Sequence, residues 1–310
     1  MFLGKTRRMD LRHPFTRAEG YAAGLTDRDF RRQEVVSLFR NVWIAADVEL
    51  TPRVLAAAAL RAVPAGSFLC HRTAGILLGS GAEVAGVVDV GSVGDQRSRL
   101  SGIESHRYRE PPETMMLGRL PVTSPAQTFV DLAATCSLVE LVTTGDQLVA
   151  SRRTTPRQLM AVADGARTRG ARTARQAARL VRPGVESRME TAARLLLVLA
   201  GLPEPVVNLR VQDGSGRARR VDLGYPEFKV AVEYDGRHHI ERETQWRNDI
   251  VRREDIEALG WRFIVLTSAD VFVTPGRSVD RVAAVLRSRG AVVTPRSTWR
   301  LHFAGRPQAS

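Results

Sequence analysis

Two acidic residues, Asp222 and Glu233, are the part of the sequence with the clearest potential for chemistry. Carboxylate oxygens are the ligands that hard cations such as Mg²⁺ prefer, and two neighbouring carboxylates repel each other unless a cation lies between them. A metal ion held in this way can activate water and neutralise the charge that develops on a phosphate during hydrolysis. The pair therefore predicts a Mg²⁺ or Mn²⁺ site, provided that the fold brings the two side chains together.

The elements around this pair must form a hairpin for that to happen. Residues 219–224 and 228–234 alternate apolar and polar side chains, which is typical of half-buried strands. Because successive side chains of a strand point to opposite faces, Asp222 and the later glutamate share a face. If the chain turns at residues 226–227, Asp222 lies opposite Ala231, and the glutamate is its diagonal neighbour at about 7 Å between Cβ atoms.

Motifs around the pair resemble those of known nucleases. Asp222, with Glu233 eleven positions later across a hairpin, resembles the core of the PD-(D/E)XK restriction-endonuclease-like superfamily, and the helical Glu190 matches the acidic residue that such domains often add. The family related to the very-short-patch mismatch-repair endonuclease is similar in VEYDGRHH (232–239), DIVR (249–252) and GWRFIV (260–265). The resemblance covers about a third of the chain and implies a metal-dependent nuclease acting on DNA.

The sequence departs from the superfamily pattern at Asp235, which stands two positions after the glutamate, where a lysine is usual. The histidine chemistry of the mismatch-repair relatives implies that His239 takes over this role, since a histidine with a pKa near neutrality can relay a proton to or from water. Arg237 and Arg252 are the alternatives. Asp235 itself is either a third metal ligand or the turn residue before Gly236.

A helix predicted over residues 245–259 adds two supporting candidates, Asp249 and Arg252. They are three positions apart and therefore neighbours on a helix, so Asp249 could orient His239 at the site. The alternative is an ordinary surface ion pair, which contributes little to stability.

The net charge of +13 and the isoelectric point near 11.1 indicate a polyanionic partner. Only Lys5 and Lys229 are lysines, so a codon preference for arginine is the alternative explanation of the composition. A basic helical connector carries four arginines spaced i, i+3, i+7 and i+10 on one predicted helix face: Arg172, Arg175, Arg179 and Arg182. We expect this stripe to follow DNA phosphates; a solvated face without a ligand is the alternative.

The N-terminal region predicts a second DNA-directed module. In residues 15–44, Thr16 and Thr26 can cap two short helices separated by Gly24, and a strand pair follows, as in a winged helix-turn-helix. Such helix pairs also occur without any DNA role. Residues 15–150 as a whole resemble the AbiEi-type antitoxin family, which implies a winged helix followed by a small α/β domain.

These observations predict an α/β (α+β) protein with a winged helix, a small α/β domain and a C-terminal restriction-endonuclease-like mixed sheet flanked by helices. The two cysteines, Cys70 and Cys136, indicate neither a disulfide framework nor a zinc site, and no apolar run reaches the roughly 20 residues of a membrane span. A cytoplasmic setting is expected. The predicted domains are a winged helix at 1–50, an AbiEi-like domain at 51–150, a basic connector at 151–185, the nuclease at 186–290 and a flexible tail at 291–310.

The function that follows is hydrolysis of DNA phosphodiester bonds by a metal-dependent endonuclease targeted by its N-terminal module. RNA stays open as a substrate and a homodimer as an assembly. The alternative is an antitoxin-like, DNA-binding transcriptional regulator whose nuclease domain has lost catalysis, which the missing lysine favours. A purely structural, partner-binding role is a third possibility that the acidic residues disfavour.

Overall fold

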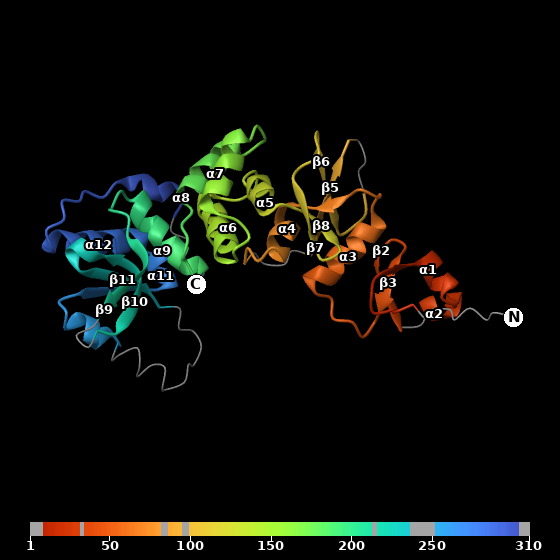
Figure 1. Ribbon diagram of the computed structural model, residues 1–310, viewed down its shortest axis with the longest axis horizontal. Helices are drawn as coiled ribbons and strands as arrows, with labels where there is room; N and C mark the ends of the chain where they lie inside the picture. The colour runs from red at the N-terminus through yellow and green to blue at the C-terminus, as the bar shows by residue number, and fades with distance from the viewer. Residues whose placement is uncertain are drawn as a thin grey trace. The chain divides into compact units, whose positions relative to one another are not determined.

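The computed structural model describes residues 9–31, 34–81, 86–94, 99–212, 216–235 and 252–303. The chain divides into two compact units. The N-terminal unit comprises Met1–Ala134 with Gly165–Gly170, and the C-terminal unit comprises Thr135–Asp164 with Ala171–Ser310. Within the described residues, helices accompany a three-stranded, a four-stranded and a five-stranded sheet, so the protein has an α/β fold (Figure 1).

The start of the N-terminal unit is a small helix–strand module. Thr16 begins α1 with a capping box, in which its side chain accepts the amide of Glu19 and the Glu19 carboxylate accepts the amide of Thr16. This module has the predicted order of two short helices followed by a strand pair, and β1 adds a third strand. Its elements are β1 (Phe15–Thr16), α1 (Arg17–Ala22), α2 (Asp27–Arg31), β2 (Val35–Phe39) and β3 (Val42–Ala45), with strand order β1-β3-β2.

The rest of the N-terminal unit is built around the five-stranded sheet. Its order is β6-β5-β4-β8-β7, with β5/β6 and β4/β8 parallel and the other pairs antiparallel. Strands that are distant in sequence thus become neighbours. The elements are α3 (Pro52–Ala62), β4 (Phe68–Leu69), α4 (His71–Leu77), β5 (Val88–Val93), β6 (Ile103–Tyr108), β7 (Thr114–Leu117), β8 (Leu120–Thr123) and α5 (Pro125–Leu132).

Helices open the C-terminal unit. α6 (Leu138–Ala150) packs against α8 (Ala171–Leu180) and α9 (Arg188–Leu199), and α7 (Pro156–Gly165) lies between α6 and α8 in the sequence. A four-stranded sheet of order β12-β11-β10-β9 follows, in which only the β11/β12 pair is parallel. Its elements are β9 (Val206–Gln212), β10 (Ala218–Tyr225), the short helix η1 (Pro226–Phe228), β11 (Val230–Tyr234), β12 (Arg262–Leu266), α11 (Ser268–Phe272) and α12 (Pro275–Ser288).

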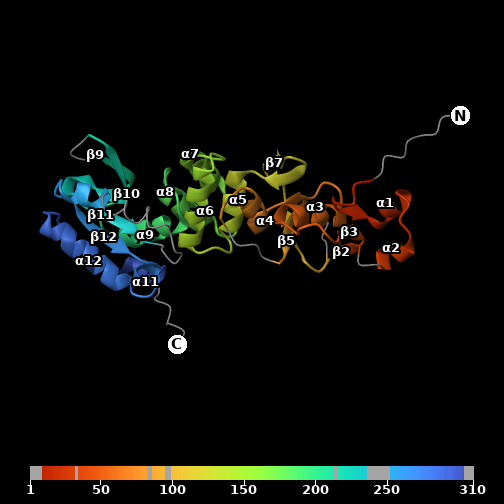
Figure 2. The same ribbon diagram turned by 90° about the horizontal axis from the view of Figure 1, so that it is seen from below.

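Helices flank this mixed sheet, as predicted. α9 contacts β10 and β11, and it also packs against α11 and α12. Figure 2 shows β9 at one edge of the sheet and α12 next to the sheet. Residues 252–257 are helical, and Ile256 packs against Val221 and Ala231 of the sheet.

The prediction of a flexible tail is wrong for residues 291–303. η2 (Ser297–Leu301) packs against α9, and Trp299 and Phe303 are buried. The amide of Arg296 donates to the Ala200 carbonyl at 2.7 Å, so this segment satisfies a backbone group at the end of α9. The prediction relied on the absence of a helical or strand-like hydrophobic pattern in this segment. Such a pattern is not needed for the hydrogen bonds and buried side chains that hold the segment in place.

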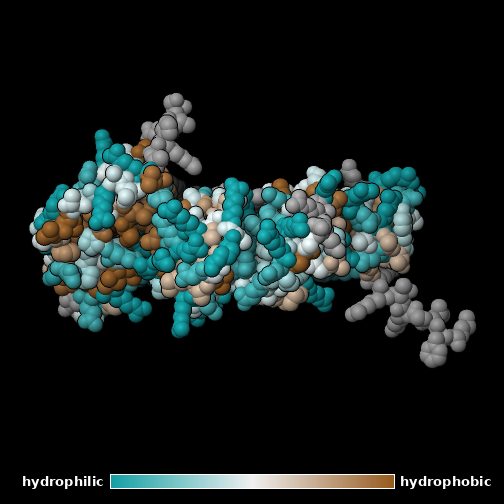
Figure 3. Space-filling view, turned by 90° about the horizontal axis from the view of Figure 1, so that it is seen from above, coloured by the Kyte–Doolittle hydropathy of each residue, from teal (hydrophilic) through white to brown (hydrophobic). Residues whose placement is uncertain are grey.

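The visible surface is largely hydrophilic, with apolar side chains gathered mainly at the left of Figure 3, where the C-terminal unit lies. None of the helices within the described ranges combines the length and the apolar character that crossing a bilayer requires.

Candidate functional site

The hairpin that carries the two predicted metal ligands has a different register from the predicted one. Leu223 pairs with Val232 and Gly224 pairs with Ala231; the ladder ends there, and Asp222 and Glu233 are the next residues along the two strands. Ala231 is therefore not the partner of the aspartate. The shift arises because residues 226–229 form a four-residue connection, with η1 and a left-handed Lys229 (φ 50°), instead of a two-residue turn.

The two acidic residues are nevertheless close enough for the charge of Glu233 to raise the pKa of Asp222. The shared face predicted from strand alternation is retained, because a shift of two residues preserves parity.

Asp222 lies in an acidic, half-buried environment. Burial raises its pKa to about 6; the amide of Tyr234, which donates to Oδ2 at 3.0 Å, opposes this shift. The charges of Glu190 and Glu233 raise the pKa further, and Arg252 lowers it. Since a cation would favour the ionised form of such a carboxyl group, the environment of Asp222 suits a metal ligand.

Glu233 is held by two arginines. Its side chain is only 5% exposed, and Arg252 donates from Nη1 to Oε1 at 2.6 Å and from Nη2 to Oε2 at 3.2 Å. Arg253 donates from Nε to Oε2 at 3.2 Å. Arg252 was predicted as a supporting residue, and it does contact a predicted ligand. The contact of Arg253 with Glu233 was not predicted. The sequence shows only that Arg253 follows Arg252, and this does not indicate how the helix over residues 252–257 packs against the sheet.

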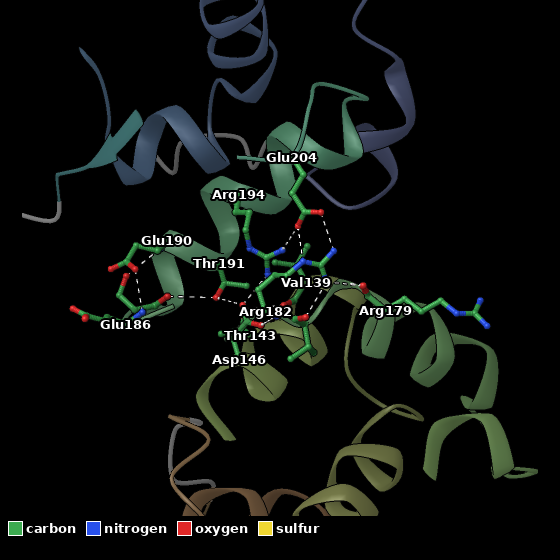
Figure 4. A network of polar contacts seen from close by, with 12 residues as sticks. Val139, Thr143, Asp146, Arg179, Arg182, Glu186, Glu190, Thr191, Arg194 and Glu204 are labelled. Carbon is green, nitrogen blue, oxygen red and sulfur yellow. Dashed lines mark hydrogen bonds and ion pairs between the residues drawn. The ribbon is translucent and has the colours of Figure 1, made fainter. Parts of the chain in front are cut away.

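Glu190 joins this region from the first turn of α9. Ser187 caps the helix by accepting the Glu190 amide, while the Glu190 carboxylate accepts the amide of Glu186 at 3.1 Å (Figure 4). Its charge acts on Asp222, so α9, β10 and β11 each bring one carboxylate to the same region. The capping contacts alone would also explain a glutamate at this position.

The remaining predicted residues are placed only in part. Asp235 follows β11, is half-buried, and donates its amide to the Leu266 carbonyl at 2.8 Å. His239 and Asp249 lie outside the described residues, as does the alternative Arg237. Asp249, predicted to be near Arg252 on one helix, therefore has no described contact with the site.

The predicted basic stripe is shorter than expected. Arg172, Arg175 and Arg179 lie on α8, whose other face buries Ala174, Ala177 and Ala178. Arg172 and Arg179 are exposed, and Arg179 makes a distant ion pair of 3.7 Å with Asp164.

Arg182 does not belong to this helical face, because α8 ends at Leu180. Its guanidinium pairs with Glu204 at 2.8 Å, and its amide donates to Asp146 Oδ1 at 2.7 Å (Figure 4). The assumption of a helix continuing to position 182 was wrong, and Arg182 holds parts of the C-terminal unit together.

A buried ion pair that the sequence did not indicate links α6 to α9. Arg194 donates from Nη2 to Asp146 Oδ2 at 2.9 Å, and both side chains are fully buried. Thr191 also donates to Asp146 Oδ2, at 2.8 Å (Figure 4). Burial raises the pKa of Asp146, while Arg194 and the hydrogen bonds oppose that shift. The pair connects the helical layer to the helix that carries Glu190.

Comparison with known proteins identifies relatives in Mycobacterium tuberculosis. No family model matches the chain. Over 251 residues the chain is 28% identical to the uncharacterized proteins MT2308 (strain CDC 1551 / Oshkosh) and Rv2248 (strain ATCC 25618 / H37Rv), which covers 80% of this chain and 91% of each relative. Among solved structures, the chain is similar to the RV2827C protein from Mycobacterium tuberculosis, with 16% identity and a TM-score of 0.38 over 64% of this chain and 83% of that one. These names state no activity.

Proposed function

We propose that the protein is a DNA-directed endonuclease that hydrolyses phosphodiester bonds with Mg²⁺ or Mn²⁺ at the acidic site of its C-terminal unit. The observation that carries this proposal is the proximity of three carboxylates, since Asp222 and Glu233 follow the paired part of one hairpin and the charges of Glu190 and Glu233 both raise the pKa of Asp222. The resemblance of the hairpin to the PD-(D/E)XK nucleases and to the very-short-patch mismatch-repair endonuclease family supports the same conclusion.

Asp222 and Glu233 are the proposed metal ligands, and Glu190 with Asp235 completes the acidic face. The donor set fits a hard cation, because its atoms are carboxylate oxygens, and burial together with the charges of Glu190 and Glu233 raises the pKa of Asp222. When bound, the metal supplies an activated water and stabilises the charge that develops on the phosphate. Arg252 and Arg253 hold the Glu233 carboxylate in the metal-free protein, and His239 is proposed to relay the proton.

DNA is the proposed substrate because the chain carries a net charge of +13 and α8 presents Arg172 and Arg179 to solvent. Phosphate contacts of this kind give affinity without base readout. The helix–strand module at the N-terminus, which resembles the AbiEi-type winged helix, is proposed as the targeting element.

The proposal is tested by nicking of supercoiled plasmid DNA in the presence of Mg²⁺, comparing the intact protein with Asp222→Asn. The matched control is Asp280→Asn, which removes an exposed carboxylate from α12. We expect Asp222→Asn to lower the rate by more than the roughly 10- to 100-fold that is typical of losing an outer-shell partner. The control should cleave normally. Equal cleavage by all three proteins, or no cleavage by any, would contradict the proposal.

A second candidate is an antitoxin-like DNA-binding regulator with an inactive nuclease domain. The two arginines on Glu233 favour it, because they place positive charge where a metal ligand is needed, and so does Asp235 at the usual lysine position. This candidate predicts salt-dependent DNA binding without nicking at any Mg²⁺ or Mn²⁺ concentration.

A further inference from the structure

A cluster of cysteine, histidine and aspartate side chains lies on the five-stranded sheet of the N-terminal unit, apart from the acidic hairpin. Cys70 follows β4, His71 is the first residue of α4, and His106 lies on β6. One potential ligand atom from each of these residues lies within 4.8 Å of the other two. Among the described residues, no group of three ligands that meets this distance includes Asp222 or Glu233.

The strand order explains how these residues meet. β5 lies between β4 and β6, so β4 and β6 are separated by a single strand. Gly91 on β5 pairs with Phe68 on one side and with His106 on the other. A Cβ at Gly91 would come within 2.3 Å of the Phe68 ring, so the glycine allows the side chains on either side to approach each other.

The two imidazoles of the cluster lie against each other. Their rings are stacked, with centroids 3.7 Å apart and planes 17° apart. Nδ1 of His71 is buried and, within the described structure, has no hydrogen-bond partner. His71 also adopts a left-handed backbone conformation, with φ at 47°. A buried nitrogen without a partner is costly, and a metal ion is one ligand that would satisfy it.

Asp89 gives the second histidine a defined orientation. His106 donates from Nε2 to Asp89 Oδ1 at 2.8 Å, and Thr73 fixes the other oxygen of Asp89 through its amide and its hydroxyl, each at 3.2 Å. Metal-bound histidines commonly donate their second ring nitrogen to a carboxylate in this way. With Nε2 bound to Asp89, Nδ1 is the ring nitrogen of His106 that would bind a metal.

The ligand set identifies the kind of ion. Thiolate and imidazole donors suit Zn²⁺ and related divalent transition metals, whereas Mg²⁺ prefers oxygen. We propose that Cys70, His71 and His106 bind a divalent transition metal of the zinc type, with Asp89 as the positioning residue for His106. Binding transfers the thiol proton of Cys70 to the solvent as the S–metal bond forms. Three protein ligands leave one coordination position for water or a further carboxylate.

The alternative is a set of core side chains that only fill space. Cys70 is fully buried, and burial raises the pKa of its thiol, so without a metal it is an unreactive, protonated group. This alternative predicts no metal affinity, and so it can be separated from the proposal by direct binding. It also argues against a role of Cys70 as a nucleophile.

The test is titration of the full-length, chelator-treated protein with Co²⁺, followed by absorption spectroscopy. We expect one thiolate-bound Co²⁺ per chain, seen as a thiolate-to-cobalt charge-transfer band with the visible bands of tetrahedral cobalt, and loss of these bands when Zn²⁺ is added. Cys70→Ser should lose the charge-transfer band, while Cys136→Ser, which alters the other cysteine, should keep it. His106→Gln should weaken Co²⁺ binding at least tenfold.

Several outcomes would overturn this proposal. One is that the intact protein has a native circular dichroism spectrum but shows no cobalt–thiolate band. The others are that the band persists in Cys70→Ser or that it disappears in Cys136→Ser. If Cys70→Ser fails to fold, the spectrum of the intact protein and of Cys136→Ser still decides the matter. Asp222→Asn should retain the cobalt spectrum, because the nuclease proposed above uses a different site.

Discussion

The guanidinium of Arg252 binds both carboxylate oxygens of Glu233, at 2.6 Å and 3.2 Å. The contact couples two properties that are usually considered separately. It neutralises a carboxylate that is almost completely buried, and it occupies oxygens that a metal ion would need. Stability and metal affinity should therefore respond in opposite directions to the loss of this arginine.

Arg252→Gln tests this coupling. We expect the variant to lose about 1–3 kcal/mol of unfolding free energy in urea, because among the described residues Arg253 is then the remaining ion-pair partner of Glu233. Mn²⁺ affinity, measured by calorimetry, should increase. The control is Arg210→Gln, an exposed arginine on β9 in the same unit. Unchanged Mn²⁺ binding in Arg252→Gln would show that the arginine does not compete with the metal.

The raised pKa of Asp222 predicts a pH-dependent stability. The folded pKa of about 6 lies above the ordinary value of 3.8, so the folded state binds the proton more tightly. The metal-free protein should lose about 3 kcal/mol from this group as pH rises from about 4 to above 6, since one pKa unit is about 1.4 kcal/mol. Urea unfolding at several pH values measures the loss. In Asp222→Asn this part of the pH dependence should be absent; a pH dependence equal to that of the intact protein would contradict the assignment.

The arginines of α8 should make DNA binding depend on salt. Each phosphate contact contributes about −0.9 to the slope of log affinity against log salt concentration. The double variant Arg172→Gln/Arg179→Gln should therefore make the slope shallower by about two units in a fluorescence anisotropy series. Arg182→Gln should leave the slope unchanged and lower stability instead, because Arg182 pairs with Glu204. The reverse pattern would mean that the DNA surface lies beyond α8.

Arg194→Ala should strongly destabilise the C-terminal unit. It leaves the Asp146 carboxylate fully buried with its hydroxyl and amide donors but without its cation. Removing one partner of a buried pair costs about 3–5 kcal/mol. The double variant Arg194→Met/Asp146→Leu should recover part of that loss in urea unfolding. A double variant less stable than Arg194→Ala would show that the hydrogen bonds to Asp146 matter more than the ion pair.

His239→Ala tests the proposed proton relay. If the imidazole acts as general acid or base, the cleavage rate should fall by about 10²- to 10⁴-fold while DNA affinity stays the same. His238→Ala, at the adjacent position, should have a milder effect. An unchanged rate and pH profile in His239→Ala would leave water activation to the metal alone.

The sequence predicted the shared face of Asp222 and Glu233 because side-chain alternation along a strand is a local property. It missed the register of the hairpin, in which Ala231 pairs with Gly224, because Pro226 and the left-handed Lys229 form a longer connection than the expected turn. The contact of Arg253 with Glu233 depends on where a helix docks, and alternation carries no such information. The meeting of Cys70 with His106 was hidden because it depends on the register across β5, where Gly91 pairs with both Phe68 and His106, and side-chain alternation does not give the register.

The segment that follows α12 has a consequence for how the protein is made. The carbonyls of Leu199 and Ala200 accept hydrogen bonds from Thr298 and Arg296, and Trp299 is buried nearby. During synthesis, α9 leaves the ribosome about a hundred residues before these partners do, which takes several seconds at ordinary elongation rates of about 5–20 residues per second. The C-terminal unit therefore cannot complete its packing until residue 303 has emerged from the ribosome. Until then, the C-terminal end of α9, the helix that carries Glu190, stays exposed.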